Sequence, residues 1–189
     1  SNTEEVKKAI KILISSGTKK KNITILHCST EYPAEKNNLN LLSIPHMKKK
    51  FNINVGYSDH SLGLQASFTA VALGAKIIEK HFTTNKNLSG PDQEASLAPN
   101  ELINLVKGIR NIETTLGNYI KEPYLAELQN LKFIRKFIVA NQKIKKGEKL
   151  TEKNLITKRA IAGIPASKWD RVIGKKAKKN FFYDENIKI

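Results

Sequence analysis

Alternation of short apolar runs with helix-forming segments in the first 120 residues is the feature that most constrains the fold. Three apolar runs bounded by polar residues predict strands at residues 23–28, 53–57 and 75–81. Helical periodicity and capping signals predict helices over residues 3–16, 39–50, 64–73 and 99–116. Because strands and helices alternate at short spacing, the sequence predicts parallel βαβ units and an α/β fold. The run at 23–28 is short, mostly apolar and bounded by polar residues, which predicts a strand buried on both faces.

A second, smaller region follows a change in sequence texture. Residues 118–130 show no clear period and are interpreted as containing a linker at 123–130, so that the first domain covers residues 1–122. Residues 131–189 combine a strand candidate at 137–140 with closely spaced turn signals, which is typical of a small, mostly β domain.

Polar residues that follow the predicted strands are the first candidates for chemistry, since functional loops in parallel α/β folds lie at the carboxyl ends of the strands. These segments are residues 29–32, 58–60 and 79–81. Two of them contain a histidine, and His60 and His81 are expected to come from adjacent strands. Two imidazoles with oxygen ligands from water or substrate suit a divalent transition metal such as manganese. Alternatively, each histidine only forms a hydrogen bond at a strand end.

Other reactive side chains carry weaker predictions. His27 lies inside an apolar strand and is expected to be a hydrogen-bonded core residue, whereas His46 follows a proline in a helix and is expected to be exposed. Cys28 has apolar neighbours and is expected to be a buried, inert thiol. Asp59, Glu79 and Asp92 offer carboxylates near the proposed site, although such acids are more often caps or surface charges. Glu79 falls in a strand expected to be buried.

Charge and composition limit the class of protein. The formal net charge is +16, and 17 of the 33 basic residues follow residue 130. Only four basic residues are arginines, which favours a solvated lysine-rich surface over phosphate recognition, so nucleic acid is not an expected partner. No apolar run approaches the length of a membrane span, and a single cysteine is typical of a reducing cytoplasm, the expected location.

Four sequence blocks together resemble the N-acetylneuraminate (sialic acid) synthase family. The blocks are His27-Cys28-Ser29-Thr30-Glu31-Tyr32-Pro33, Gly56-Tyr57-Ser58-Asp59-His60-Ser61, Glu79-Lys80-His81-Phe82 and Gly90-Pro91-Asp92. The tail, with Ile144-Lys145-Lys146-Gly147-Glu148 and Lys158-Arg159, is similar to the antifreeze-protein-like (SAF) domain of those enzymes. The resemblance runs in order through essentially the whole chain.

The resemblance implies the C-terminal portion of a (β/α)8 TIM barrel, about three βα units, followed by the small antifreeze-like domain. It also implies a domain-exchanged homodimer. The chain begins at what corresponds to the helix after the fifth barrel strand, so the earlier strands are expected from elsewhere, including a separate chain. The 189 residues alone are not expected to be a self-sufficient catalyst.

The activity implied is the condensation of phosphoenolpyruvate with N-acetylmannosamine or a related N-acetylated amino sugar, giving N-acetylneuraminate or a relative and phosphate. By the same resemblance, His60 and His81 bind Mn²⁺, with Mg²⁺ as the alternative metal, and act with Glu79 in catalysis. The resemblance further implies that Glu79 and Asp92 face the sugar. It also implies substrate contacts for the residues Ser58, Thr30, Tyr32, Asp92 and Arg159. The Arg-Pro-Gly-x-Gly motif usual around this arginine is here Arg159-Ala160-Ile161-Ala162-Gly163.

Two alternatives remain open at the level of sequence. One is a legionaminic or pseudaminic acid synthase, of which the Gly90-Pro91-Asp92 and Ala95-Ser96-Leu97 segments favour the sialic and legionaminic branch. The other is a noncatalytic assembly module that uses its cationic domain to bind a polyanion or a partner subunit.

Overall fold

The computed structural model describes the backbone of residues 1–189 and every side chain except that of Lys132. The chain divides into two compact units, Ser1–Asn118 and Tyr119–Ile189. Each unit contains an apolar core of its own. No helix among the described residues is both long and apolar enough to cross a membrane.

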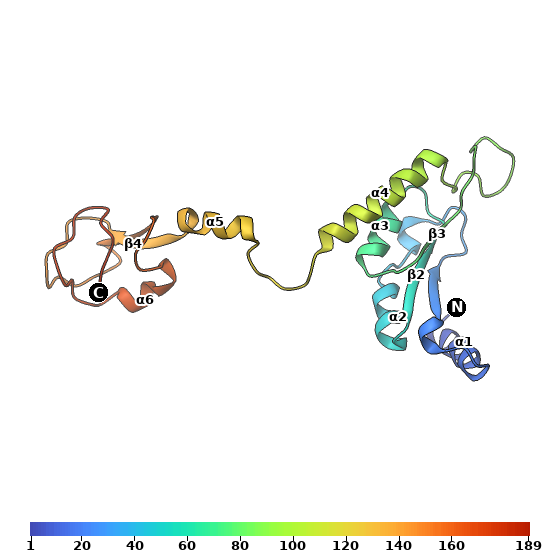
Figure 1. Ribbon diagram of the computed structural model, residues 1–189, viewed down its shortest axis with the longest axis horizontal. Helices are drawn as coiled ribbons and strands as arrows, with labels where there is room; N and C mark the ends of the chain where they lie inside the picture. Colours follow the sequence, from blue (N-terminus) through green and yellow to red (C-terminus); the bar gives the residue numbers. More distant parts are fainter. The chain divides into compact units, whose positions relative to one another are not determined.

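The first unit is a three-stranded parallel sheet, in the order β1-β2-β3, with helices between its strands (Figure 1). Its strands are β1 (Thr24–Cys28), β2 (Asn54–Asp59) and β3 (Ile78–Lys80). Its helices are α1 (Thr3–Ser15), α2 (Ser43–Phe51), α3 (Gln65–Ala72) and α4 (Pro99–Leu116). Short 3-10 turns occupy Lys20–Asn22 and Lys36–Asn38. The predicted α/β fold with three consecutive βα units is therefore confirmed.

Local sequence signals explain where several helices begin. The side chain of Asn2 accepts hydrogen bonds from the backbone N–H groups of Glu4 and Glu5, both at 3.0 Å, and the Glu5 carboxylate accepts one from Asn2 N at 2.6 Å. This reciprocal capping satisfies donors that the first turn of α1 leaves without a helical partner. Pro45 and Pro99 both lie in the first turn of their helices, where a proline costs no hydrogen bond.

The main core of the first unit lies between the sheet and the helices α2 and α3. Val55 and Tyr57 of β2 pack there against Ile44 of α2 and Ala70 of α3. Figure 1 shows α2 and α3 beside β2, with α4 outside α3. Alternation along β2 directs Gly56 and Ser58 to the opposite face of the sheet.

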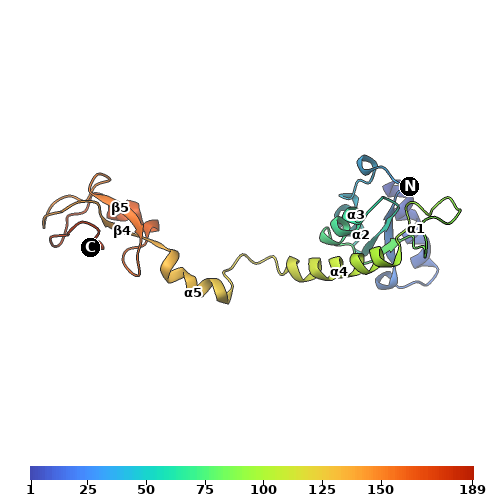
Figure 2. The same cartoon turned by 90° about the horizontal axis from the view of Figure 1, so that it is seen from above.

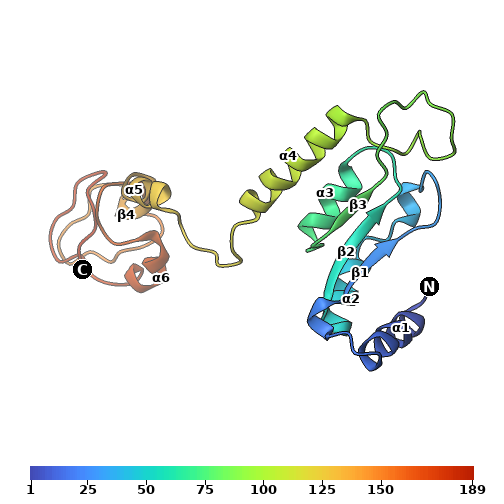
Figure 3. The same cartoon turned by 45° about the vertical axis from the view of Figure 1, so that its right-hand side comes forward.

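Strand β1 is an outer strand of the sheet, nearest α1 in Figure 3. Four of its residues are half-buried and Cys28 is exposed. The prediction that this strand is buried on both faces is therefore wrong, because an apolar run reports the capacity to be buried and not the presence of a covering layer.

The second unit is built on a pair of antiparallel strands, as expected for a small, mostly β domain. The strands are β4 (Lys136–Ala140) and β5 (Leu155–Arg159). The helices are α5 (Leu125–Ile134), the 3-10 turn Ala166–Lys168 and α6 (Trp169–Val172). Its core contains fully buried side chains from strands, turns and α6, among them Ile138, Ile144, Leu150, Val172 and Phe181.

Helix α5 occupies most of residues 123–130, which the sequence analysis interpreted as a linker without a clear period. The helix begins at Leu125, where the Glu127 carboxylate accepts a 2.9 Å hydrogen bond from Tyr124 N, and leads directly into β4 (Figure 2). Leu125 and Leu128 are both exposed. The apolar residues of α5 are not gathered on one face of the helix, so the sequence shows no helical periodicity of apolar residues there.

Candidate functional site

The two predicted metal-site histidines lie together at the carboxyl ends of β2 and β3. The ring centroids of His60 and His81 are 5.1 Å apart, with the ring planes nearly perpendicular. Tyr32, from the loop after β1, stacks on His60 at 4.1 Å and lies 5.6 Å from His81. Loops from all three strands thus meet at this point, as the topology of a parallel sheet requires.

The orientation of His60 is fixed by the backbone after β1. His60 Nδ1 lies 2.6 Å from the carbonyl oxygen of Ser29. Because a carbonyl only accepts, Nδ1 carries the proton, and the lone pair of the neutral ring belongs to Nε2. A backbone carbonyl bound to one ring nitrogen is the usual way in which proteins orient a metal-binding histidine.

Ser58 and Glu79 are joined by a hydrogen bond between β2 and β3, close in the sequence to the two histidines. They are register partners in β2 and β3, and Ser58 Oγ donates a 2.6 Å hydrogen bond to Glu79 Oε1. Ser58 is buried, whereas Glu79 is exposed. The expected burial of Glu79 is therefore wrong, since its side chain lies on the sheet face opposite α2 and α3.

Asp92 approaches the site from the long loop between β3 and α4. Asp92 Oδ2 lies 3.7 Å from His81 Nδ1, a distance that suits electrostatic attraction or a bridging water more than a direct hydrogen bond. Two further predicted residues are placed differently. Thr30 is exposed on the loop after β1, and Arg159 is the exposed last residue of β5 in the second unit.

A cavity of about 870 Å³ opens beside this group, between α1, β1 and the segment that leads into α2. Its lining residues include Cys28 and Thr30, together with Ile10, Leu13 and Met47. His60 and His81 are not among its lining residues. The cavity therefore adjoins the outer strand β1, and the histidine pair lies to one side of it.

The remaining histidines and the cysteine separate into confirmed and wrong predictions. His27 is half-buried with Nε2 2.7 Å from the carbonyl oxygen of Leu39, and His46 is exposed, both as expected. Cys28 is exposed, with Sγ 3.9 Å from His60 Nδ1, so the expected inert buried thiol is wrong. Cys28 has apolar neighbours in the sequence, but β1 pairs with one strand, β2, and lies at the edge of the sheet. Apolar neighbours in the sequence therefore do not bury the thiol.

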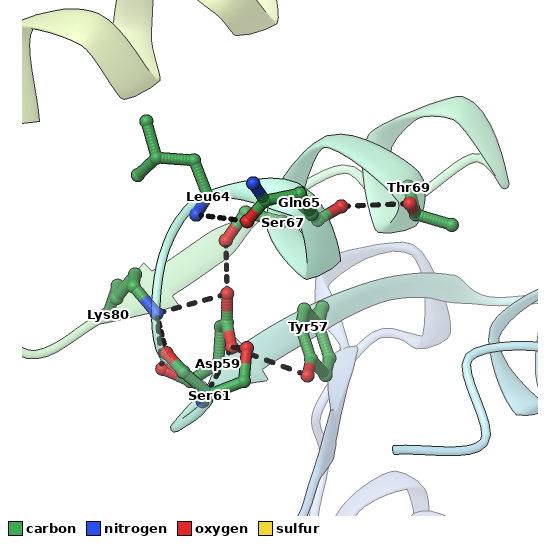
Figure 4. Close-up of polar contacts among 8 residues, drawn as sticks. All are labelled: Tyr57, Asp59, Ser61, Leu64, Gln65, Ser67, Thr69 and Lys80. Carbon is green, nitrogen blue, oxygen red and sulfur yellow. Dashed lines mark hydrogen bonds and ion pairs between the residues drawn. The ribbon is translucent and has the colours of Figure 1, made fainter. Parts of the chain in front are cut away.

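A buried ion pair between the residues that precede the two histidines in the chain was not predicted from the sequence. Lys80 Nζ lies 3.1 Å from Asp59 Oδ2, and both side chains are almost inaccessible to solvent (Figure 4). Asp59 Oδ1 also lies 3.4 Å from the hydroxyl of Tyr57, whose pKa is raised by burial and, secondarily, by the negative charge of Asp59. Asp59 thus lies next to the site, and the alternative that it is a surface charge is wrong. Its position opposite Lys80 in two adjacent strands was the available signal.

Comparison with known proteins assigns the chain to a family. Residues 1–121 match the NeuB family, and residues 135–188 match the SAF domain. The chain belongs to the NeuB family. The resemblance inferred from the four sequence blocks is thereby confirmed.

Several relatives of this NeuB-family chain are nonulosonic acid synthases. It is 48% identical over 187 residues to N,N'-diacetyllegionaminic acid synthase of Campylobacter jejuni, covering 99% of this chain and 56% of that protein. It is 36% identical over 168 residues to human N-acetylneuraminate-9-phosphate synthase, covering 88% of this chain and 47% of that protein. The chain thus spans about half the length of the curated relatives it matches.

Solved structures of related proteins support the same fold. The N-acetylneuraminic acid synthetase of Leptospira borgpetersenii matches with a TM-score of 0.64 and 35% identity, over 70% of this chain and 46% of that one. The spore coat polysaccharide biosynthesis protein SpsE of Bacillus subtilis matches with a TM-score of 0.58 and 31% identity, over 100% of this chain and 57% of that one.

Proposed function

We propose that this chain provides the metal-binding and sugar-facing part of a nonulosonic acid synthase. The observation that carries the proposal is the convergence of His60 and His81, at the ends of adjacent strands, in a NeuB-family chain. The enzyme condenses phosphoenolpyruvate with an N-acetylated amino sugar. Because the chain spans about half of its relatives, phosphate-binding groups from the rest of a synthase complete the site.

The reaction follows from the chemistry of the two substrates. C3 of phosphoenolpyruvate forms a bond with the aldehyde carbon of the open-chain sugar, and the aldehyde oxygen takes up a proton. Water then adds at C2 of the former phosphoenolpyruvate and loses a proton. The bond between C2 and the bridging oxygen breaks, so that inorganic phosphate leaves with that oxygen and C2 becomes a ketone. The net products are the nonulosonic acid and inorganic phosphate.

The histidine pair fits a divalent metal ion, and we propose Mn²⁺, with Mg²⁺ as the alternative. The Ser29 carbonyl holds His60 in the tautomer whose Nε2 lone pair is available, and the ring of His81 stands 5.1 Å away, centroid to centroid. Within the described part of the chain, no cluster of three or more His, Cys, Asp or Glu side chains is arranged to hold a metal. Two imidazoles leave the other positions to water and substrate oxygens, and the metal would supply Lewis-acid polarisation of the aldehyde oxygen.

The surrounding side chains have distinct proposed roles. Ser58 orients the Glu79 carboxylate through their 2.6 Å hydrogen bond and binds phosphoenolpyruvate, while Glu79 accepts hydrogen bonds from sugar hydroxyl groups and serves as the proton-transfer group. Tyr32 covers one face of His60 and excludes water from it.

Asp92 and Thr30 contact substrate from their loops, and Arg159 of the SAF domain binds sugar oxygens in a domain-exchanged homodimer.

The acceptor sugar that we favour is the one that gives N,N'-diacetyllegionaminic acid. The chain is 48% identical to a synthase of that acid, but 36% identical to the pseudaminic acid synthase of the same species and to human N-acetylneuraminate-9-phosphate synthase. Phosphate release from phosphoenolpyruvate, measured with this acceptor and with N-acetylmannosamine in parallel, distinguishes the two products.

The decisive experiment measures Mn²⁺-dependent phosphate release in a synthase that contains this chain together with the remaining barrel strands. We expect His60→Ala and His81→Ala each to reduce kcat/KM roughly 100-fold or more, since Lewis-acid stabilisation is worth several kcal/mol. His46→Ala is the matched control, because His46 is exposed on α2 and lies outside the site. Unchanged activity and unchanged metal content in the two site variants would show the metal assignment to be wrong.

A further inference from the structure

We propose that the buried Asp59–Lys80 ion pair is a positioning device that sets the placement of His60 relative to His81. The expected effect of the ion pair on metal affinity rests on the proposed function. Its expected effect on the orientation of the two imidazole rings does not. Asp59 immediately precedes His60, Lys80 immediately precedes His81, and Asp59 and Lys80 are register partners. The ion pair therefore links the ends of β2 and β3 at the two residues that directly precede the histidines.

Besides the Tyr57 hydroxyl in β2 itself, the carboxylate of Asp59 has donors from three other segments. Oδ1 accepts hydrogen bonds from the N–H and the hydroxyl of Ser61, at 2.9 and 2.7 Å. Oδ2 accepts one from the hydroxyl of Ser67 in α3 at 2.5 Å and lies 3.1 Å from Lys80 Nζ. The carboxylate thus ties the end of β2 to the following turn, to α3 and to β3 (Figure 4).

The ammonium group of Lys80 closes the same turn from the other side. Lys80 Nζ donates a 2.6 Å hydrogen bond to the carbonyl oxygen of Ser61. His60 therefore lies between two residues, Asp59 at the end of β2 and Ser61 after it, that are both bound to Lys80. With the backbone held in this way, the ring of His60 reaches the Ser29 carbonyl and the face of Tyr32.

A purely stabilising role explains this pair poorly. The side chains of Lys80 and Asp59 are 2% and 0% exposed, so both charges have lost their hydration. The desolvation cost of such a pair often cancels its Coulombic gain, and apolar side chains of similar volume are then equally stable or more so. What the ion pair adds is geometric, because its hydrogen bonds fix one arrangement of the turn.

The test compares the wild-type chain with the uncharged, near-isosteric double variant Asp59→Asn/Lys80→Met. The first readout is the tautomer of His60 and the contact between the two rings, observed by NMR on ¹⁵N-labelled histidine without any metal. The second readout is the Mn²⁺ dissociation constant of the same protein. We expect His60 in the double variant to lose its preference for the Nδ1–H tautomer. We also expect the Mn²⁺ dissociation constant to rise roughly 10-fold or more, the usual effect of mutating a residue that holds a metal ligand in place.

A matched control is the exposed ion pair of the same unit, Lys86–Glu101, whose Nζ–Oε2 distance is 2.7 Å. Lys86→Met/Glu101→Gln removes an ion pair by equivalent substitutions, and both readouts should stay at the wild-type values. Ser61→Ala is a second, milder variant in case the first does not fold, because it removes one hydrogen bond to Asp59 and keeps both charges. Its expected effect on both readouts is smaller and in the same direction.

The possible outcomes separate this proposal from the proposed function. A folded double variant, or Ser61→Ala, with an unchanged His60 tautomer and unchanged ring contact overturns the positioning role. If wild-type protein binds Mn²⁺ with no dependence on His60 or His81, the metal assignment fails, and the NMR readout still decides whether the ion pair positions the rings.

Discussion

The hydroxyl of Ser58 donates a 2.6 Å hydrogen bond to Glu79 Oε1 across two neighbouring parallel strands. The bond joins a buried residue to an exposed one on the sheet face opposite α2 and α3. A carboxylate at the solvent-facing end of such a bond has one oxygen held in place and another available for a ligand. This geometry gives Glu79 a defined orientation before any substrate arrives.

Ser58→Ala should lower kcat/KM of the complete synthase roughly 10-fold or more, because a hydrogen bond to a charged group is worth about 1.5–3 kcal/mol. Ser15→Ala, on the exposed end of α1, is the control and should leave the kinetics unchanged. The measurement is phosphate release at varied sugar concentration. A variant with wild-type kcat/KM would show that Ser58 neither binds substrate nor orients Glu79.

Gly56→Ala should destabilise the first unit by about 1–3 kcal/mol, the usual cost of overpacking. A Cβ atom at Gly56 would lie 2.4 Å from Leu26 Cδ2 and 2.6 Å from the carbonyl oxygen of Ile77. Leu26 Cδ2 is the end of a side chain, but the carbonyl oxygen of Ile77 is backbone and accepts a 2.8 Å hydrogen bond from Tyr57 N, so it cannot move without disturbing the pairing of β2 with the segment that leads into β3. Urea unfolding of the variant is compared with that of Asn54→Ala, at the exposed start of the same strand. Equal midpoints for the two variants would contradict the close packing described.

Phe181→Ala should destabilise the second unit by about 3–5 kcal/mol, because it opens a cavity in the core. Phe181 is fully buried, whereas its neighbour Phe182 is 64% exposed. Phe182→Ala is therefore a control of identical chemistry and should cost well below 1 kcal/mol. Fluorescence of Trp169, the single tryptophan of the chain, which packs against this core, reports the unfolding. Similar costs for both variants would show that the burial pattern is wrong.

Acid should weaken the second unit partly through Glu185. Its carboxylate accepts hydrogen bonds from Lys179 and from Phe182 N, and these lower its pKa below the ordinary value. A pKa that is lower in the folded state stabilises the fold above the unfolded-state pKa, and this stabilisation is lost as pH falls through the folded-state value. Glu185→Gln should therefore reduce the loss of stability below about pH 4.5, near the unfolded-state pKa of a glutamate.

Urea unfolding between pH 3 and pH 7, followed through Trp169, measures this difference. Glu152→Gln, at an exposed position of the same unit, is the control and should retain the wild-type pH dependence. If wild-type protein and Glu185→Gln lose stability in parallel as the pH falls, the contacts of Glu185 with Lys179 and Phe182 do not contribute.

Much of the site was predictable because parallel βαβ topology is itself predictable. Once the apolar runs are assigned to adjacent parallel strands, residues that follow them must meet at one edge of the sheet, which brings His60 and His81 together. The four sequence blocks added the family. The ion pair that precedes the histidines was not predicted. Alternation places Asp59 on the same face of β2 as Val55 and Tyr57, but it gives neither the register that pairs Asp59 with Lys80 nor the helix that covers them.

For the first unit, the sequence alone determined the order of strands and helices, the parallel sheet and the edge at which the polar side chains gather. These features follow from local periodicity and from the handedness of βαβ connections, which act over short stretches of chain. Only the tertiary structure decided which side chains are covered: Cys28 and Glu79 are exposed, and Asp59 is buried against Lys80. Burial depends on which segments pack over a residue, and those segments are distant in the sequence, so no local pattern specifies it.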